Sequence, residues 1–362
     1  MDRYDVLVAG CGPVGAVLAA RLAAHGLTAL VVERDPSPFP LPRAVAADDE
    51  VQQLLSRTAP GLVESMLAAP EVRFVDGRRR SLGSVAFPGA HGFPGLAFFH
   101  QPTLEAALRA HLADRVEVRL GTSLNSWTQR SSSVTASLSD GSSVSAGWLV
   151  GCDGASSAVR RAAGIAWHGR DLPQPWLVAD VTGTVPERQH FTYTCDPARP
   201  QVDLPVPGGH RWEWLLRDGA QDAAALLRRD TCADVEVVRA VVYRFGARRA
   251  ASWQAGRVLL AGDAAHTMPP FAGQGLGAGL RDAWALAALL ARGDVSAYEP
   301  LRVPHVRQMT RLSLLLGAAL QARHGSTARD ALLRGAFRSP GLGPWLASGG
   351  PRRSDSGVLD LS

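Results

Sequence analysis

Gly10, Gly12 and Gly15 have the residue type and spacing that could bind a phosphate group. A short apolar run, residues 4–9, precedes them, and a helical pattern over residues 14–25 follows. In such a strand–turn–helix unit, the first glycine permits a tight turn, the second admits a pyrophosphate, and the third allows close packing. Because the helix N-terminus adds N–H groups and a positive dipole, we expect this turn to bind a dinucleotide.

Glu33 follows the next apolar run, residues 27–32, at the predicted end of a second strand. A carboxylate at that place can accept hydrogen bonds from the hydroxyls of an adenosine ribose. The segment therefore combines a strand, a glycine turn, a helix and the acidic residue Glu33 in the expected order. This order favours a dinucleotide site over a glycine turn that binds no ligand. It does not distinguish NAD from FAD.

Two further motifs follow predicted buried strands later in the chain. The first is Asp153-Gly154, which by itself is equally typical of an ordinary turn. The second is Gly262-Asp263, followed by Pro270 and by a glycine-rich loop over residues 273–276 that opens a helix. A carboxylate at a strand end can bind sugar-chain hydroxyls, and such a loop offers N–H donors to a phosphate or an anionic ring.

Taken together and in this order, the motifs resemble those of the FAD-dependent aromatic hydroxylases. These are single-component flavoprotein monooxygenases with the p-hydroxybenzoate hydroxylase fold, and the resemblance runs from residue 4 to about residue 320. It implies that the cofactor-binding residues are Gly10, Gly12, Gly15, Glu33, Arg34, Arg43, Gln101, Leu124, Asp153, Gly154, Asp263, Pro270, Gly273, Gln274, Gly275 and Leu276.

The resemblance also implies a role for many of these residues. Glu33 would bind the adenosine ribose, Arg43 would lie near the pyrophosphate, and Gln101 would contact FAD. The backbone of Leu124 would meet the adenine, and Asp263 would bind the ribityl chain. Asp153-Gly154 would serve both FAD and NAD(P)H, and the loop from Pro270 to Leu276 would lie beside the isoalloxazine ring.

The activity that the resemblance implies is hydroxylation of a small aromatic molecule. NAD(P)H, and NADPH in preference to NADH, would reduce the FAD, and reduced flavin would add O2 to form a C4a-hydroperoxide. The distal oxygen would then pass to an electron-rich carbon of the ring, while the protein keeps the site dry. Because the sequence has no second dinucleotide-binding unit, we expect NAD(P)H to bind transiently at the groove between domains.

Three segments resemble one branch of the family, the 3-(3-hydroxyphenyl)propionate hydroxylases. They are residues 43–50, with Arg43-Ala44-Val45 and Asp48-Asp49-Glu50, residues 195–200 and residues 298–305. The resemblance to this branch implies that the substrate is a phenol.

Asp48 and Tyr193 are our candidates for the catalytic polar residues, because either could polarise a substrate hydroxyl. The alternatives are a helix-capping Asp48 and a packed Tyr193. We expect His266 to support its loop rather than act as a base. Gly277 stands where the family commonly has Asn, which predicts looser placement of the flavin.

Several other functions stay open from the sequence. One is a flavin-dependent reductase or dehydrogenase of the same fold, and another is a non-redox protein that keeps flavin as structure. Trp212-Glu213-Trp214 is similar to a halogenase motif, but Ile-Pro does not follow and the lysine those enzymes need is missing. The two tryptophans share one strand face and could equally pack in the core or line the pocket.

The composition excludes several classes of function. None of the 38 basic residues is lysine, which excludes a Schiff-base lysine, a P-loop lysine and a lysine general base. The net charge of +5 comes from arginines scattered among acids, which disfavours a nucleic-acid partner. Cysteines 11, 152, 195 and 232 are too dispersed for a metal site or a disulfide framework. With no membrane span and no leader before the first strand, we expect a cytoplasmic protein.

A chain of 362 residues suggests about two domains. Helical patterns at 48–57, 103–113, 276–292 and 304–323 alternate with strand patterns at 116–120, 133–138, 143–150 and 258–261. We therefore predict the α/β class, with a Rossmann-like FAD-binding domain that carries an inserted, mainly antiparallel β-sheet substrate domain. The FAD-binding domain would comprise residues 1–70, 101–170 and 252–335, the substrate domain 71–100 and 171–251, and a loose C-terminal tail 348–362.

Overall fold

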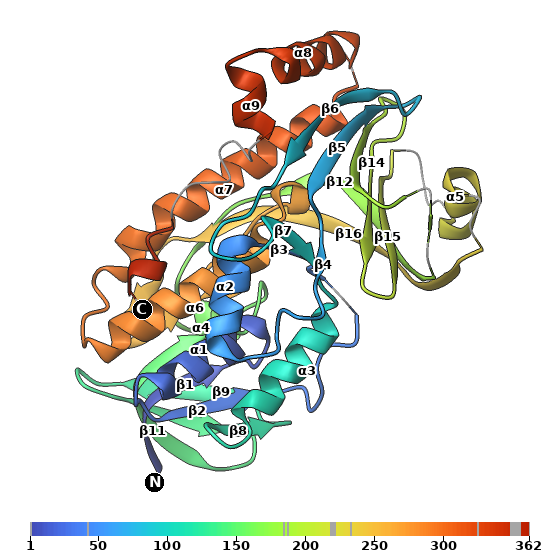
Figure 1. Ribbon diagram of the computed structural model, residues 1–362. Helices are drawn as coiled ribbons and strands as arrows, with labels where there is room; N and C mark the ends of the chain where they lie inside the picture. Colours follow the sequence, from blue (N-terminus) through green and yellow to red (C-terminus); the bar gives the residue numbers. More distant parts are fainter. Residues whose placement is uncertain are drawn as a thin grey trace.

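The computed structural model describes residues 2–41, 43–183, 185–186, 188–217, 222–231, 234–323, 326–347 and 356–361. Two large sheets occupy different ends of the molecule, and helices lie between them and along one side (Figure 1). In each sheet, strands from distant parts of the sequence are neighbours. Neither sheet is therefore formed by one continuous segment of the chain.

The first sheet is built on the parallel strands that begin the chain. β1 lies between β2 and β11, parallel to both. The strand order is β17 (Gln254–Ala255), β18 (Val258–Leu260), β11 (Ser143–Gly151), β1 (Asp2–Ala9), β2 (Ala29–Glu33) and β8 (Glu117–Leu120), with β10 (Val134–Leu138) and β9 (Leu124–Gln129) joined through β11. Val6, Leu7 and Val8 have no exposed surface, as expected for parallel strands covered on both faces.

Helices cover this sheet and continue from it. They are α1 (Pro13–Ala24), α2 (Asp49–Thr58), α3 (Gln101–Leu112), α4 (Ala158–Ala162), α6 (Gly275–Ala291) and α7 (Tyr298–Gln321). α1 packs against α3 and α6, and the small residues on its buried face allow that close approach. A single apolar core holds the sheet and these helices together.

The second sheet is mainly antiparallel. Its order is β19 (His266–Thr267), β16 (Glu236–Ala250), β12 (Trp167–Thr182), β15 (Gly209–Leu215), β14 (Gln201–Val206), β13 (Phe191–Cys195), β5 (Glu71–Asp76) and β6 (Ser81–Ala86). β13 and β5 are the parallel neighbours within it. A small sheet of β3 (Ala46–Asp48), β7 (Leu96–Phe98) and β4 (Leu67–Ala68) lies near α2.

Alternation along β15 divides its side chains between two environments. Trp212 and Trp214 have no exposed surface and pack in a cluster with α5 (Ala223–Asp230). The indole of Trp214 donates a hydrogen bond to Asp230 Oδ2 at 2.8 Å. We left core packing and pocket lining open for these tryptophans, and in the structure they pack in the core. Because side chains alternate along a strand, Arg211 and Glu213 face the other side of the sheet.

The predicted fold class is confirmed, with differences near the C-terminus. α7 begins at Tyr298, earlier than the predicted residue 304, and Pro304 lies within it. Proline inside a helix removes one backbone hydrogen bond and crowds the carbonyl four residues before it, so α7 continues through Pro304 without that bond. α8 (Ser326–Arg338) and α9 (Leu342–Ala347) were not predicted, and α8 packs against β6.

The predicted loose tail is corrected where the structure describes it. Ser356 Oγ donates a hydrogen bond to Glu50, and Val358 is fully buried in the first core before η4 (Leu359–Leu361). These contacts hold residues 356–361 against α2 and α6. Residues 348–355 and 362 of the predicted tail lie outside the described residues.

Among the described residues, no helix combines the length and the apolarity that crossing a membrane requires.

Candidate functional site

A cavity of about 1090 Å³ runs from the first glycine turn to the inner face of the second sheet. It brings together residues from the glycine turn, the Asp153-Gly154 motif and the motif from Gly262 to Leu276. Those of the predicted cofactor residues that line it are Gly10, Gly12, Glu33, Arg34, Arg43, Gln101, Leu124, Asp153, Gly154, Asp263, Pro270, Gly273, Gly275 and Leu276. Tyr193 also lines the cavity, whereas Gly15, Gln274 and Asp48 do not.

The glycine turn leaves space where a phosphate would lie. A Cβ on Gly10, whose φ is +106°, would lie 2.5 Å from the carbonyl oxygen of Cys152, and one on Gly15 would lie 2.0 Å from that of Gly10. A Cβ on Gly12 would meet nothing within 4 Å. Gly12 is also the N-cap of α1 and makes no side-chain cap, so the first N–H groups of that helix are available to an anion.

Glu33 is fixed by the turn that it faces. Its Oε2 accepts a hydrogen bond from the N–H of Cys11 at 2.7 Å, and its Oε1 accepts one from the N–H of Asp35 at 3.0 Å. Each oxygen can accept a second bond, so the carboxylate is oriented for a hydroxyl donor without being saturated. Arg34 is exposed and lies 3.5 Å from the carboxylate of Asp35.

Gln101 holds the loop that carries Arg43. Its side-chain oxygen accepts hydrogen bonds from the backbone N–H of Arg43 at 3.0 Å and of Ala44 at 2.7 Å. From the second sheet, Arg211 Nη1 donates to the carbonyl oxygen of Arg43 at 2.9 Å. The loop is therefore clamped from both sides of the cavity, and the guanidinium of Arg43 stacks over Phe39 at 4.5 Å.

Asp153 has one satisfied and one unsatisfied oxygen. Oδ2 accepts hydrogen bonds from the N–H groups of Ala158 at 2.7 Å and Val159 at 3.1 Å, at the start of α4. Oδ1 is buried and has no hydrogen-bond partner in the part of the chain that the structure describes. Because a buried acceptor without a donor is costly, this oxygen fits a ligand that brings a hydroxyl or an N–H group.

Asp263 lies in η1 (Gly262–Ala264) and is exposed to the cavity. A buried network fixes its loop from behind. Asp282 Oδ2 accepts a hydrogen bond from the N–H of Gly262 at 3.1 Å and lies 2.6 Å from His266 Nε2. Its Oδ1 accepts one from Arg302 Nε at 2.8 Å. His266 thus supports the loop, as we expected, and Asp263 is left facing the cavity.

Asp48 makes the contacts of the helix-capping alternative that we left open for it. Its Oδ1 caps α2 by accepting from the N–H of Val51 at 2.9 Å, and both carboxylate oxygens lie 2.9 Å from Arg281 Nη2. Burial alone would raise the pKa of Asp48, but the charge of Arg281 and the Val51 hydrogen bond hold that pKa below its usual value. Arg281 also bonds Glu50 at 2.6 Å and Gln274 at 3.3 Å, so Gln274 acts within this network.

Gly277 is explained by the same arginine. A Cβ at this position would lie 2.9 Å from Arg281 Nη1 and 3.0 Å from Val51 Cγ2. A larger side chain here would therefore compete with Arg281 for space. The glycine makes room for the ion pair that joins α6 to α2.

Tyr193 faces the cavity from β13 and anchors the predicted flavin loop. Its hydroxyl donates to the carbonyl oxygen of Phe271 at 2.6 Å, in η2 (Pro270–Ala272). Its ring stacks on Phe74 with centroids 5.1 Å apart, and Phe191 packs at 4.9 Å. The hydroxyl is engaged with the loop, and the rings make this end of the cavity apolar.

A charged cluster on the second sheet was missed by the sequence reasoning. Asp180 accepts hydrogen bonds from Arg211 at 2.6 and 3.0 Å and from Arg239 at 3.3 Å, and Arg239 also bonds the hydroxyl of Tyr243. Arg211, Glu213, Arg239 and Tyr243 all line the cavity. Strand alternation could have identified two of them, because tryptophans on one face of β15 leave Arg211 and Glu213 on the other.

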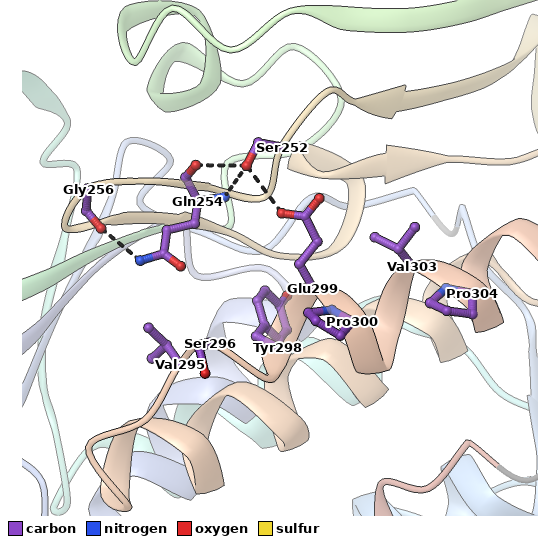
Figure 2. Close-up of a pocket in the computed structure, with 10 residues that line it drawn as sticks. All are labelled: Ser252, Gln254, Gly256, Val295, Ser296, Tyr298, Glu299, Pro300, Val303 and Pro304. Atoms are coloured by element: carbon purple, nitrogen blue, oxygen red, sulfur yellow. Dashed lines mark hydrogen bonds between the residues drawn. The ribbon is translucent and has the colours of Figure 1, made fainter.

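A second, shallower cavity of about 690 Å³ lies between β17 and the start of α7. Figure 2 shows Glu299 directed toward Ser252 on its wall. Glu299 Oε2 accepts hydrogen bonds from Ser252 Oγ at 3.2 Å and from the N–H of Trp253 at 3.1 Å. Its carboxylate therefore fixes the chain locally. None of the predicted cofactor residues lines this cavity, although residues of the 298–305 segment do.

Comparison with protein families gives a match over residues 3–313 to the model described as "FAD binding domain". A 3-(3-hydroxy-phenyl)propionate/3-hydroxycinnamic acid hydroxylase from Mycobacterium sp. (strain JLS) is 37% identical, over 93% of this chain and 64% of the relative. A protein from Rhodococcus jostii (strain RHA1), named "Probable NADH-specific resorcinol 4-hydroxylase", is 34% identical, over 90% of this chain and 68% of the relative. The chain thus spans about two-thirds of the length of these curated relatives.

Two solved structures are similar in fold. The p-nitrophenol 4-monooxygenase of Pseudomonas putida DLL-E4 superposes with a TM-score of 0.82 at 23% identity, covering 100% of this chain and 98% of that one. An aklavinone-11 hydroxylase, solved with FAD and aklavinone, superposes with a TM-score of 0.76 at 27% identity, covering 91% of this chain and 71% of that one.

Proposed function

This chain belongs to the FAD-binding family of aromatic hydroxylases, and from that premise we propose that it is an FAD-dependent monooxygenase. In this proposal it uses NAD(P)H and O2 to hydroxylate a small aromatic molecule, and we expect that molecule to be a phenol. The observation that carries the proposal is the single cavity that joins the glycine turn, Asp153 and the 270–276 loop to an apolar wall of the second sheet.

The residues present fit FAD. The uncapped N-terminus of α1 and the open space at Gly12 suit a pyrophosphate, and the unsatisfied oxygen of Asp153 suits a hydroxyl donor. When bound, FAD would supply the redox chemistry, taking reducing equivalents from NAD(P)H and activating O2. Glu33 and Asp263 would orient the cofactor, with the remaining predicted cofactor residues in the roles that the family implies.

Around the ring, the protein's task is to position the substrate and exclude water. Tyr193 and Phe271 fix the edge of the 270–276 loop, while Phe191 and Phe245 line the cavity with apolar surface. A dry site protects reactive oxygen chemistry from water. We propose that Tyr193 contributes as a loop anchor beside the substrate, and that Asp48 acts indirectly, as a positioning residue through Arg281.

The domain division follows from the same proposal. Residues 1–70, 101–170 and 252–335 would bind FAD, and residues 71–100 and 171–251 would contribute the substrate wall. NAD(P)H would bind transiently between them. We also propose a cytoplasmic location, which the free thiols of Cys11, Cys152 and Cys195 support.

The test is anaerobic reduction of the flavin-loaded protein by NADH and by NADPH, with and without simple phenols, followed by admission of oxygen. We expect loss of the oxidised-flavin absorbance and then a ring product heavier by one oxygen atom. Reduction without any aromatic product would favour the reductase or dehydrogenase alternative. Failure of both nucleotides to reduce the flavin would favour a non-redox flavin protein.

A further inference from the structure

We propose that Glu213 contacts the aromatic substrate directly and accepts a hydrogen bond from its ring hydroxyl. By holding that hydroxyl, Glu213 would set which ring carbon faces the 270–276 loop. This inference deepens the proposed function and rests on it. It is argued from the position of Glu213 in the sheet, from its neighbours and from the charge around it.

Strand register places Glu213 in a row of apolar side chains. Val202 on β14 and Val178 on β12 are its partners on either side, and Tyr193 is in turn the partner of Val202. Directly paired residues point to the same face of a sheet, so this row faces the cavity, which all four residues line. Tyr193 binds the Phe271 carbonyl, so the row extends to the predicted flavin loop.

The neighbouring arginine does not neutralise Glu213 by a hydrogen bond. Arg211 Nη1 lies 4.0 Å from the Glu213 carboxylate, beyond hydrogen-bond distance. The guanidinium is instead directed to Asp180 through Nε and Nη2 and to the carbonyl oxygen of Arg43 through Nη1. Among the described residues Glu213 has no hydrogen-bond partner, although its side chain is 12% exposed.

The Glu213 carboxyl can therefore accept a hydrogen bond from a ligand that packs on the neighbouring Val178 and Val202. Because Glu213 reaches the cavity and has no donor among the described residues, a ligand hydroxyl would displace only water and would gain a hydrogen bond to a charged acceptor. The charges around Glu213 are balanced, because the two positive charges of Arg211 and Arg239 lie beside the two negative charges of Asp180 and Glu213. A neutral phenol preserves that balance when it binds, whereas a carboxylate placed against Glu213 would upset it.

The protonation state of Glu213 gives a second way to test the proposal. Burial raises the pKa of its carboxyl, Arg211 and Arg239 lower it, and Asp180 raises it. The groups that face it are therefore Asp180 from β12, Arg211 from its own strand and Arg239 from β16. An ionised carboxylate accepts a stronger hydrogen bond than a protonated one, so phenol binding should weaken as the pH falls through this raised pKa.

The experiment measures ligand affinity on the flavin-loaded protein by the change in flavin absorbance. The probes are resorcinol and its dimethyl ether, 1,3-dimethoxybenzene, which cannot donate a hydrogen bond. We expect Glu213→Leu to weaken resorcinol binding about tenfold or more, with Glu213→Gln intermediate because its amide oxygen still accepts. The ether should bind wild type and both variants alike.

The matched control is Glu236→Gln, an exposed carboxylate on the same sheet, which should bind resorcinol as wild type does. In wild type, resorcinol affinity should fall toward low pH, and Glu213→Gln should remove that dependence. Even without variants, wild type should bind resorcinol about tenfold more tightly than the ether.

Equal resorcinol binding by wild type and Glu213→Leu would overturn the inference while leaving the proposed function standing. Equal binding of resorcinol and the ether by wild type would do the same. If wild type bound no hydroxylated ring at all, yet bound FAD, the proposed function would fail and the inference with it.

Discussion

Gly12 and Gly15 lie in the same turn, yet a methyl group at each has a different consequence. At Gly15 it would meet the Gly10 carbonyl oxygen at 2.0 Å, whereas at Gly12 it would meet no atom of the described residues within 4 Å. We predict that Gly15→Ala destabilises the protein itself by about 2–3 kcal/mol. Gly12→Ala should leave the unfolding temperature of the flavin-free protein unchanged and weaken FAD binding by about tenfold or more, because the methyl enters the ligand's space.

Thermal unfolding without FAD and a fluorescence titration with FAD measure these two effects separately. If Gly12→Ala bound FAD as wild type does, the pyrophosphate would not lie at this turn.

At the residue scale, the sequence predicted well wherever a backbone requirement is local. The glycine turn, Asp153 and Asp263 could each be identified from neighbouring residues, and all reach the cavity. Strand alternation could also have placed Glu213 on the face opposite the tryptophans. Its surroundings could not be predicted, because they depend on which strands flank β15 and on where Arg211 is directed. The ion pair of Asp48 could not be predicted, because its partner, Arg281, lies 233 positions away in the sequence.

The ion pair between Asp48 and Arg281 joins α2 to α6, and it has a pH signature. Because the folded-state pKa of Asp48 is lowered, its contribution to stability is present above the ordinary aspartate pKa and is lost as the pH falls below it. We predict that Asp48→Asn costs about 3 kcal/mol at pH 7. The difference from wild type should shrink below about pH 4.

Denaturant unfolding across that pH range measures the difference. A catalytic Asp48 would behave otherwise: the asparagine variant would unfold like wild type at pH 7 and lose turnover alone.

The hydroxyl of Tyr193 joins β13 to the 270–276 loop. Tyr193→Phe would leave the Phe271 carbonyl oxygen without that donor, at 2.6 Å in wild type, and should cost about 1 kcal/mol of stability. We expect turnover to fall only slightly, with the pH dependence of kcat unchanged. A variant that lost an ionisation from the kcat profile would instead place this hydroxyl on the reacting substrate.

Element boundaries were predicted best where the pattern was strongly periodic. α6, expected at residues 276–292, spans Gly275–Ala291. α8 was not predicted. None of its described residues is fully buried, and its contacts with the second sheet come from the half-buried Leu333 and Phe337. Residues 356–361 were expected to be loose because the tail from residue 348 is rich in polar residues, Gly and Pro. In the structure Val358 is fully buried, Leu359 and Leu361 pack against the first core, and Ser356 bonds Glu50.

For the whole molecule, FAD should act as a structural element between the two sheets. The cavity that would hold it is lined from both, so empty protein lacks much of the contact across its centre. Saturating FAD, at about 100 times its Kd, should stabilise the folded state by about 2.7 kcal/mol and raise the Tm by on the order of 5 °C. Scanning calorimetry with and without added FAD measures the shift, and an unchanged Tm would argue against FAD as the ligand of this cavity.

The most direct test of the central claim follows the oxygen atom itself. The flavin-loaded protein is supplied with NAD(P)H, a phenol that perturbs its flavin absorbance and 18O2, and the ring products are analysed by mass spectrometry. The account predicts one 18O atom in each product molecule and one nicotinamide nucleotide oxidised for each. Oxidation of the nucleotide with no label in any aromatic product, across every phenol that binds, would contradict it.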